Sequence, residues 1–314
     1  MNDIREAMYW SAAENGGVRC GLCPHRCHLA ENSAGICGVR ENLGGRLVAS
    51  GYGQVSSVAL DPIEKKPLYM FYPGKNVLSI GGFGCNLRCP FCQNYEISMS
   101  VPSFGELPMM PTGGARGVGE PAEDVRVAGA RSPYARTPGE IAALAVQIVP
   151  NGNIGVAYTY NEPLIGYEFV YDCAKLIHGA GLKNVVVTNG YINMEPLKEL
   201  LPLIDAMNID LKGLGDGFYR KLGGESETVK ETIALSHKHC HVEVTTLVIP
   251  GENEGDIEGI ALWLSSIDPG IPLHLSRFFP RYRYEDRAPT PRETIHRLKK
   301  AAKGYLKHVF IGNM

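Results

Sequence analysis

Short apolar runs alternate with amphipathic stretches from residue 76 onward, a pattern typical of parallel β/α units. The runs predict six strands, at residues 77–80, 154–158, 184–188, 207–211, 242–249 and 272–276. Two connecting helices carry start signals, because Thr137 and Thr290 each precede a proline and stand three residues before a glutamate. The pattern therefore predicts an α/β fold in which each strand is followed by a helix.

The first 75 residues follow a different pattern. Residues 1–45 hold four cysteines among glycine, asparagine and histidine with little periodicity, which predicts a small loop-rich extension. Residues 46–58 alternate, which predicts a β-hairpin or an edge strand. We expect two domains, a Cys-rich extension with its hairpin at 1–75 and a β/α domain at 76–314. Residues 98–136 are rich in Gly, Pro, Ala and Ser, which predicts a flexible insertion, with a functional lid as the alternative.

Composition and charge narrow the class of protein. A chain of 314 residues with 44% hydrophobic and 20% charged residues excludes a disordered tail or a coiled coil. Its 31 basic and 33 acidic residues leave no positive excess, so we expect no nucleic-acid partner. No window reaches the roughly 18 apolar residues of a membrane span. Because residues 1–17 also lack the features of a signal peptide, we expect a cytoplasmic protein with no membrane contact.

Three cysteines stand on one short loop after the first of the six strands. Cys85, Cys89 and Cys92 have CxxxCxxC spacing, with Phe91 before the last. Three thiolates are one too few for a closed tetrahedral site, whereas a [4Fe-4S] cluster held by three leaves one iron open to an external ligand. The alternatives are a zinc site completed by a remote ligand, or buried thiols. The preceding strand, the aromatic residue and the β/α context favour the cluster.

This loop resembles the cluster motif of the radical SAM superfamily. The resemblance implies a partial (β/α)6 TIM-like barrel in which S-adenosylmethionine binds the fourth iron. Residues 61–69, 89–94 and 157–163 further resemble the AmmeMemoRadiSam system radical SAM enzymes, relatives of pyruvate formate-lyase-activating enzymes. The implied partners are an electron donor such as flavodoxin or ferredoxin and an unknown substrate or partner protein.

The activity that the resemblance implies is that of an oxidoreductase. Reductive cleavage of S-adenosylmethionine would give a 5′-deoxyadenosyl radical, which takes a hydrogen atom from a small molecule, a peptide or a protein. One alternative is activation of a glycyl-radical enzyme. Val187 and Thr245 stand where the activating enzymes have Asp and Arg, which slightly favours a substrate modified directly. The non-enzyme alternative is a zinc-ribbon scaffold that binds a protein.

Carried over by position, the resemblance also implies a set of residues that contact S-adenosylmethionine. They are Phe91, Tyr160, Asn161, Glu162, Thr188, Asn189, Asp210, Lys212, Ile249, His274 and Arg277. Glu162 and its neighbours would receive the ammonium group, and Lys212 would approach the carboxylate. Each has an ordinary alternative. Glu162 can cap a helix, Lys212 can form a surface ion pair, and His274 can pack in the core.

A second group of cysteines lies in the extension. Cys20, Cys23, Cys27 and Cys37 give CxxCxxxC spacing with a fourth cysteine nine residues on. Four thiolates suffice for zinc or for an auxiliary iron–sulfur cluster, and His25 or His28 can replace one of them. Free thiols packed in a small knot are the third interpretation. Cys173 and Cys240 stand alone, and we expect both to be structural thiols.

Overall fold

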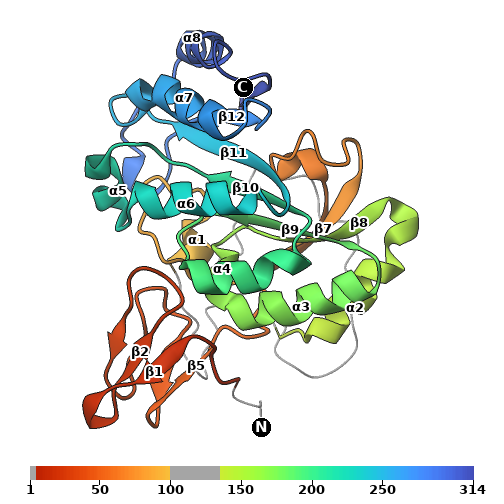
Figure 1. The fold of residues 1–314 in the computed structure, drawn as a ribbon, viewed down its shortest axis with the longest axis vertical. Helices are drawn as coiled ribbons and strands as arrows, with labels where there is room; N and C mark the ends of the chain where they lie inside the picture. Colours follow the sequence, from red (N-terminus) through yellow and green to blue (C-terminus); the bar gives the residue numbers. More distant parts are fainter. Residues whose placement is uncertain (1–4, 100–134) are drawn as a thin grey trace.

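An open eight-stranded sheet forms the centre of the computed structural model, which describes residues 5–99 and 135–314 (Figure 1). Its order is β13-β12-β11-β10-β9-β8-β7-β6. The strands are β6 (Ser57–Pro62), β7 (Asn76–Gly81), β8 (Asn153–Tyr158), β9 (Lys183–Thr188), β10 (Ala206–Asp210), β11 (His241–Val248), β12 (Leu273–Arg277) and β13 (Val309–Gly312). β6 runs antiparallel to β7, and all other neighbours are parallel. Because the order ends at β6 and β13, the sheet is a partial TIM-like barrel, as predicted.

The six predicted strands are confirmed as β7 to β12, each within one residue at either end. β13 was not predicted, and the predicted alternating segment ends at residue 58, where β6 is beginning. Strand pairing joins β6 to the large sheet, although the predicted division at residue 75 assigned it to the extension. We therefore propose a domain boundary between residues 48 and 57.

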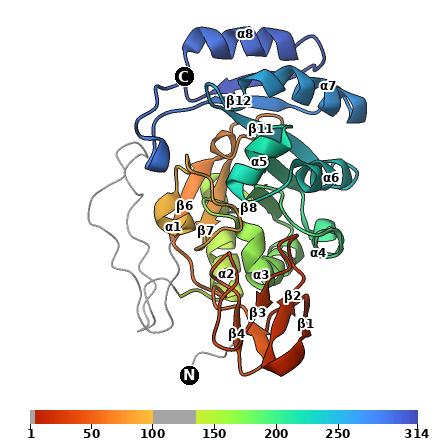
Figure 2. The ribbon, with the colours of Figure 1, turned by 90° about the vertical axis from the view of Figure 1, so that its left-hand side faces the viewer.

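Helices connect the parallel strands. They are α1 (Tyr95–Ser98), α2 (Pro138–Gln147), α3 (Tyr167–Gly179), α4 (Met194–Leu200), α5 (Asp216–Leu222), α6 (Ser226–Ser236), α7 (Ile257–Ile267) and α8 (Arg292–Ala302). In Figure 2, α4, α6 and α7 lie on the right of the strands, and β6 and α1 lie on the left. Helices α4, α6 and α7 thus cover one face of the sheet, and α1 lies on the opposite side. None of the helices in the described ranges has the length and hydropathy needed to cross a bilayer.

The two helix start signals have different outcomes. At α2 the Thr137 hydroxyl accepts from the backbone of Glu140, and the Glu140 carboxylate accepts from the backbone of Thr137, which confirms the capping box. The prediction for Thr290 is wrong, because α8 starts after Pro291 with no side-chain cap. The Thr290 hydroxyl instead donates to the carbonyl oxygen of Val248 at 2.6 Å, inside the core.

Residues 63–71 fill the concave face of the sheet near the amino ends of the strands. Ile63, in the 3₁₀ turn η2 (Ile63–Lys65), and Leu68 are fully buried in one cluster. The small strand residues of that cluster are Val77, Ala157, Val185 and Ala206. Polar anchors fix the segment, since the Glu243 carboxylate accepts from the backbone amides of Tyr69 and Met70 at 3.0 and 2.7 Å. This segment closes one end of the barrel and leaves the carboxyl ends of the strands open.

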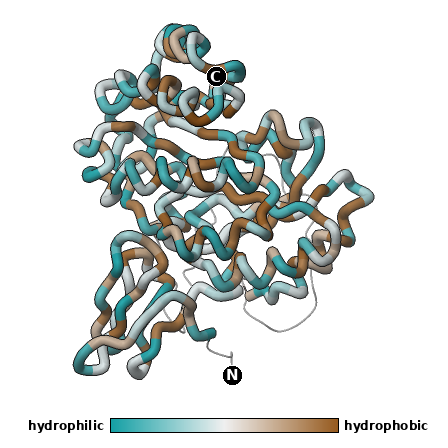
Figure 3. Tube along the Cα trace, viewed as in Figure 1, coloured by the Kyte–Doolittle hydropathy of each residue, from teal (hydrophilic) through white to brown (hydrophobic). Residues whose placement is uncertain are grey.

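The extension is a separate small β structure (Figure 1). It contains β1 (Trp10–Ala12), β2 (Val18–Cys20) and β3 (His28–Leu29) in one antiparallel sheet, and the hairpin β4 (Glu41–Leu43)–β5 (Arg46–Val48). A buried ion pair joins it to α3, because the Arg40 guanidinium donates to both Glu168 oxygens at 3.0 Å. Figure 3 shows hydrophobic residues concentrated along the central strands and alternating with polar ones on the outer helices. The apolar core thus lies between sheet and helices, and it positions the carboxyl ends of the strands.

Candidate active site

A cavity of about 380 Å³ lies at the carboxyl ends of the parallel strands. It is lined by residues from the loops after β7, β8, β9 and β10 and from the later parts of β11 and β12. Ligand sites of TIM-like and other α/β folds lie at this end of the sheet, and pockets of about 300–1,000 Å³ hold small ligands. This cavity is therefore the candidate active site.

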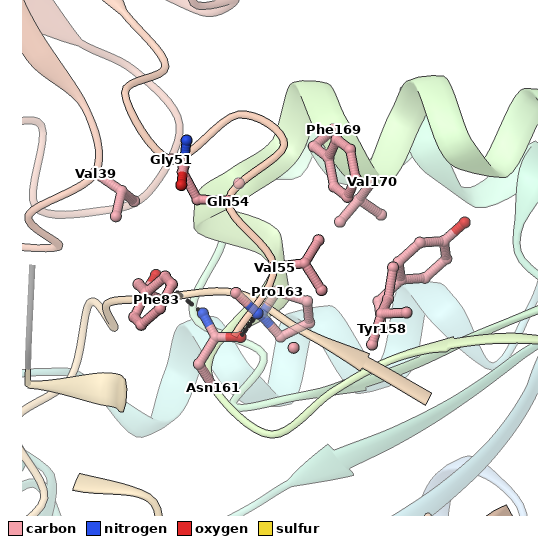
Figure 4. A pocket seen from close by; sticks show the side chains of 14 residues that line it. Val39, Gly51, Gln54, Val55, Phe83, Tyr158, Asn161, Pro163, Phe169 and Val170 are labelled. Atoms are coloured by element: carbon pink, nitrogen blue, oxygen red, sulfur yellow. Dashed lines mark hydrogen bonds between the residues drawn. The ribbon is translucent and has the colours of Figure 1, made fainter. Parts of the chain in front are cut away.

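The loop that carries Cys85, Cys89 and Cys92 enters the cavity from β7. Asn161 fixes its start, because its Oδ1 accepts from the backbone N of Gly82 at 2.9 Å and its Nδ2 donates to the carbonyl oxygens of Phe83 and Gly84 at 3.0 and 3.1 Å (Figure 4). At Gly84, φ is +80°, and a Cβ there would collide with the carbonyl oxygen of Cys37. The loop is thus held by β8 on one side and by the extension on the other.

Three free thiols line the cavity. Cys89 is buried, and Cys85 and Cys92 are half-buried. Burial raises the pKa of Cys89 to about 11 against the lowering effect of Lys212, and burial also raises the pKa of Cys85. In the described ranges no fourth cysteine and no histidine lines this cavity. A donor set of three thiols on one loop fits a [4Fe-4S] cluster with one open iron, and it does not complete a zinc tetrahedron.

Glu162, at the end of β8, joins the cavity to the backbone around it. One carboxylate oxygen accepts from the backbone N of Leu164 at 3.0 Å and from the Thr188 hydroxyl at 2.7 Å, and the other accepts from the backbone N of Asn189 at 2.7 Å. Burial raises its pKa to about 7, and these three hydrogen bonds oppose the rise. Glu162 therefore caps the turn η4 (Pro163–Gly166), as the ordinary alternative predicted, and it also lines the cavity.

Asp210 and Lys212 lie at the end of β10. Lys212 Nζ donates to Asp210 Oδ2 at 2.9 Å, and the Lys212 side chain is 14% exposed while Asp210 is 38% exposed. Burial alone would lower the pKa of Lys212, but Asp210 and the nearby Cys89 thiol raise it, so the ammonium stays charged. The pair therefore lies at the wall of the cavity beside the thiols, where its charges are available to a ligand.

The structure brings most of the predicted contact residues to this cavity. The residues that line it are Phe91, Tyr160, Asn161, Glu162, Thr188, Asn189, Asp210 and Lys212. Three others lie outside the lining. His274 Nε2 bonds Glu243 Oε2 at 2.6 Å deeper in the barrel, Arg277 Nε donates to the Thr290 carbonyl at 2.6 Å, and Ile249 is fully buried. Their role as cofactor contacts stays a prediction.

Sequence reasoning gave no role to a polar group at the inner end of the cavity. Asp61 Oδ2 accepts from Lys66 Nζ at 2.8 Å and from the Tyr160 hydroxyl at 2.6 Å, while Asp61 Oδ1 accepts from Lys65 Nζ at 3.2 Å. Burial alone would raise the pKa of Asp61, but these hydrogen bonds lower it by more than burial raises it. The pKa of Asp61 is therefore well below the usual range. The run of residues 61–67 was the available signal, because two lysines follow one aspartate at turn spacing. Lys65 and Lys66 line the cavity.

A second cavity, of about 40 Å³, lies behind the cluster loop (Figure 4). Its walls are mostly apolar and include Val39, Val55, Phe83 and Phe169. It has room for ordered water but not for a substrate.

The thiols of the extension have other surroundings. Cys20, Cys23 and Cys37 are buried, Cys27 is half-buried, and none is in a disulfide. No three His, Cys, Asp or Glu side chains in residues 5–99 and 135–314 converge as a single metal ion requires. With Zn–S bonds of about 2.3 Å the sulfurs of a zinc site stand about 3.8 Å apart, so the structure does not show a formed zinc site.

Comparison with known proteins matches this architecture. The model of the Radical SAM superfamily matches residues 79–264. An uncharacterized protein of Methanocaldococcus jannaschii is 40% identical over 99% of this chain and 86% of its own length. The pyruvate formate-lyase 1-activating enzyme of Escherichia coli is 26% identical over 46% of this chain and 66% of that enzyme. Streptococcus suis SuiB bound to S-adenosylmethionine shares the fold with a TM-score of 0.50 at 12% identity, over 75% of this chain and 51% of SuiB. The chain therefore belongs to the radical SAM superfamily.

Proposed function

We propose that this chain is a radical SAM enzyme that uses the 380 Å³ cavity to bind S-adenosylmethionine and a substrate. The observation that carries the proposal is the set of three free thiols on one loop, facing a cavity with no fourth cysteine or histidine among its described lining residues. A [4Fe-4S] cluster with S-adenosylmethionine supplies, when bound, one-electron cleavage to methionine and a 5′-deoxyadenosyl radical that takes a hydrogen atom from the substrate.

In this proposal the side chains of the cavity bind and orient. The cluster is held by Cys85, Cys89 and Cys92. Because Cys89 is buried, the side of the cluster that it binds is shielded from water. Glu162 receives the ammonium group of S-adenosylmethionine, because its oxygens keep lone pairs beyond the three hydrogen bonds that orient them. Lys212 receives the carboxylate, since Asp210 holds its ammonium at the cavity wall.

For the substrate we propose a small molecule, a peptide or a protein that is modified directly. Val187 and Thr245 line the cavity, and they replace the Asp and Arg of the activating enzymes, so the cavity lacks two charges of those relatives. Activation of a glycyl-radical enzyme is the second candidate, supported by the 26% identity to the Escherichia coli activating enzyme. We also propose that the chain is of the AmmeMemoRadiSam type, which the resemblance of residues 61–69 supports. A cytoplasmic location and a flavodoxin or ferredoxin as electron donor complete the proposal.

For the thiols of the extension we propose an auxiliary iron–sulfur cluster rather than zinc. The thiolates around an iron–sulfur cube stand farther apart than those around one ion, so the absence of single-ion convergence in the described residues is compatible with a cluster and with free thiols, and it disfavours zinc. A Cys20→Ala/Cys23→Ala variant should then contain about four irons fewer per chain than the parent protein. Zinc in the parent protein, or an unchanged iron content in the variant, would refute the auxiliary cluster.

The main proposal is tested by anaerobic reconstitution with iron and sulfide. We expect S-adenosylmethionine to yield 5′-deoxyadenosine under dithionite, and a Cys89→Ala variant to lose about four irons and this cleavage together. Cys173→Ala is the matched control, because Cys173 is a buried thiol of α3 away from the cavity, and it should keep both. Cleavage that survives in Cys89→Ala would refute this loop as the site of the cluster. Zinc bound at this loop, with no cleavage in the parent protein, would refute the enzyme and favour the protein-binding scaffold.

A further inference from the structure

Two exposed arginines and two half-buried tyrosines form a group beside the cluster loop. We name Tyr95, Arg281, Tyr282 and Arg283 the basic ridge. The Tyr95 and Tyr282 rings stack at 4.6 Å between centroids, Arg281 lies 5.6 Å above the Tyr95 ring, and Arg283 lies 5.3 Å from the centre of the Tyr282 ring. Tyr95 belongs to α1, and the other three residues lie between β12 and α8. Two segments far apart in the sequence thus form one surface.

The ridge contacts the cluster loop directly. The backbone N of Arg283 donates to the carbonyl oxygen of Pro90 at 2.9 Å, and Pro90 lies between Cys89 and Cys92. The ring of Tyr284, next along the chain, lies 6.0 Å from the ring of Phe91. The ridge therefore packs against the loop that carries the three thiols.

Within the described residues, the two arginines of the ridge have no ion-pair partner. Arg281 and Arg283 are exposed, and neither forms an ion pair with a carboxylate in residues 5–99 or 135–314. The nearby carboxylate of Glu252 forms ion pairs with Lys221 at 2.7 Å and with Arg287 at 2.9 Å. These three side chains together carry one net positive charge. Glu285 and Asp286 follow the ridge in the chain, yet the segment 277–287 still holds four arginines against these two acids. A local positive surface on a chain of net charge −2 favours an acidic partner.

The position of the ridge selects the kind of partner. Neither Arg281 nor Arg283 lines the 380 Å³ cavity, so a protein bound to the ridge reaches the cluster loop from outside. A substrate that gives up a hydrogen atom must enter the cavity, whereas an electron donor needs only a short distance to the cluster. We propose that the basic ridge docks an acidic one-electron donor protein of the flavodoxin or ferredoxin class. The donor is oxidised by one electron and the cluster is reduced by one, so the inference rests on the proposed function.

Arginines and stacked tyrosines suit a transient contact of this kind. Arg and Tyr are enriched among the side chains that dominate binding energy, and stacking keeps these four ordered before a partner arrives. The charge accelerates association and makes it sensitive to salt, because the screening length falls from about 10 Å at 0.1 M to about 3 Å at 1 M ionic strength.

The test measures binding of oxidised flavodoxin to the reconstituted protein by calorimetry. We expect Arg281→Ala/Arg283→Ala to raise Kd about ten-fold or more at 0.1 M salt, with most of the difference lost at 1 M. The matched control is Arg297→Ala/Lys300→Ala, which removes two exposed charges from α8 and should leave Kd unchanged. Equal Kd values for ridge variant and parent protein would overturn the proposal. A short RNA that loses binding in the ridge variant while flavodoxin does not would also overturn it.

A second readout separates this inference from the proposed function. We expect the ridge variant to cleave S-adenosylmethionine at the parent rate with dithionite, and about ten-fold more slowly with limiting reduced flavodoxin. Absence of cleavage with dithionite in the parent protein would refute the proposed function, while the binding measurement would still judge the ridge. Loss of flavodoxin binding in Cys20→Ala/Cys23→Ala, with binding kept in the ridge variant, would place the donor on the extension and overturn the proposal.

Discussion

The two groups of cysteines differ in what surrounds them more than in their spacing. Cys85, Cys89 and Cys92 line a cavity of about 380 Å³ together with Glu162 and Lys212. The thiols of the extension line neither of the two cavities described. A loop that opens to a cavity can present a metal to a ligand. Thiols that line no cavity can bind a structural metal or stabilise the fold, but they do not present a metal to a ligand.

The cluster loop also contacts the extension. His25 Nε2 bonds the carbonyl oxygen of Asn86, next to Cys85, at 2.7 Å, and the Asn86 side chain bonds the Cys23 thiol. The guanidinium of Arg88 bonds the carbonyl oxygen of Ile36 in the extension. The extension therefore forms part of the support of the cluster loop, and changes in one group can be tested for effects on the other.

The largest expected effect is on the attachment of the extension. Arg40→Met leaves the fully buried Glu168 carboxylate without its cation, and we expect a loss of about 3–5 kcal/mol in the free energy of unfolding. Urea unfolding followed by circular dichroism measures it. In the double variant Arg40→Met/Glu168→Gln no charge is buried, and the Gln oxygen still accepts from the backbone N of Met8, so most of the loss should be recovered. An equal loss in both variants would show that shape, rather than charge, attaches the extension.

Part of this architecture was readable from the sequence, because local pattern decides it. The six parallel strands follow from short apolar runs, and the cluster loop follows from three cysteines at fixed spacing after a strand. Glu162 was found through the resemblance of residues 157–163 to a known family, and it lies four residues after the end of β8. Residues 98–136 were predicted to be a flexible insertion, and of these 100–134 lie outside the described residues.

The rest depends on contacts between distant segments. The Tyr160 hydroxyl donates to Asp61, which is 99 residues away in the sequence, and no local pattern predicts that hydrogen bond. Thr290 has the sequence signature of a helix cap, but its hydroxyl donates to the carbonyl oxygen of Val248 in the core and therefore does not cap the helix. His274 is on the expected strand, yet Ser276, two residues later on the same face, is the one that lines the cavity. Depth along a strand is set by the register of the whole sheet, which sequence spacing does not give.

The next largest effect is expected at Glu243, at the closed end of the barrel, where none of the cysteines of the two groups lies. This region serves as a reference for both groups. Burial raises the pKa of Glu243, but bonds from His241, His274 and two backbone amides lower it more, to about 2 from 4.5. Because the pKa is lower in the folded state, the stabilisation is complete above about pH 4.5 and is lost as the pH falls toward 2. It amounts to about 3 kcal/mol.

Urea unfolding between pH 5 and 2.5 measures this loss. Glu243→Gln should be less stable than the parent protein at pH 5, and the difference should shrink with falling pH. A constant difference over this range would contradict the assignment of the acid sensitivity to Glu243. The same measurement on Cys20→Ala/Cys23→Ala, with variant and parent protein both free of iron, should give a constant difference, because the free thiols carry no charge in this pH range.

A smaller effect is expected on the cofactor at the open group. Lys212→Ala removes a cation from the cavity wall, and we expect the Kd of S-adenosylmethionine to rise about ten- to a hundred-fold with the iron content unchanged. Equilibrium dialysis with labelled cofactor measures it. Lys65→Ala is the matched control, since it removes a lysine from the Asp61 end of the same cavity and should change Kd less than about three-fold. Unchanged binding in Lys212→Ala would reduce the Asp210–Lys212 contact to an ion pair with no ligand.

The smallest expected effect addresses the contact between the two groups itself. Asn86→Ala removes the hydrogen bond between the Asn86 side chain and the Cys23 thiol of the extension. It also removes the donor to the carbonyl of Tyr191 and the acceptor at 2.9 Å of the Asn189 amide, and we expect a cost of about 1–2 kcal/mol. If the extension and the cluster loop support each other, amide hydrogen exchange should become faster in residues 20–27 and 84–92 together. Asn193→Ala is the control, because its side chain binds the carbonyl oxygen of Gly21 without touching the loop, and it should affect residues 20–23 alone. Faster exchange in only one of the two segments of Asn86→Ala would mean that the packed thiols and the open thiols are independent neighbours, each stable without the other.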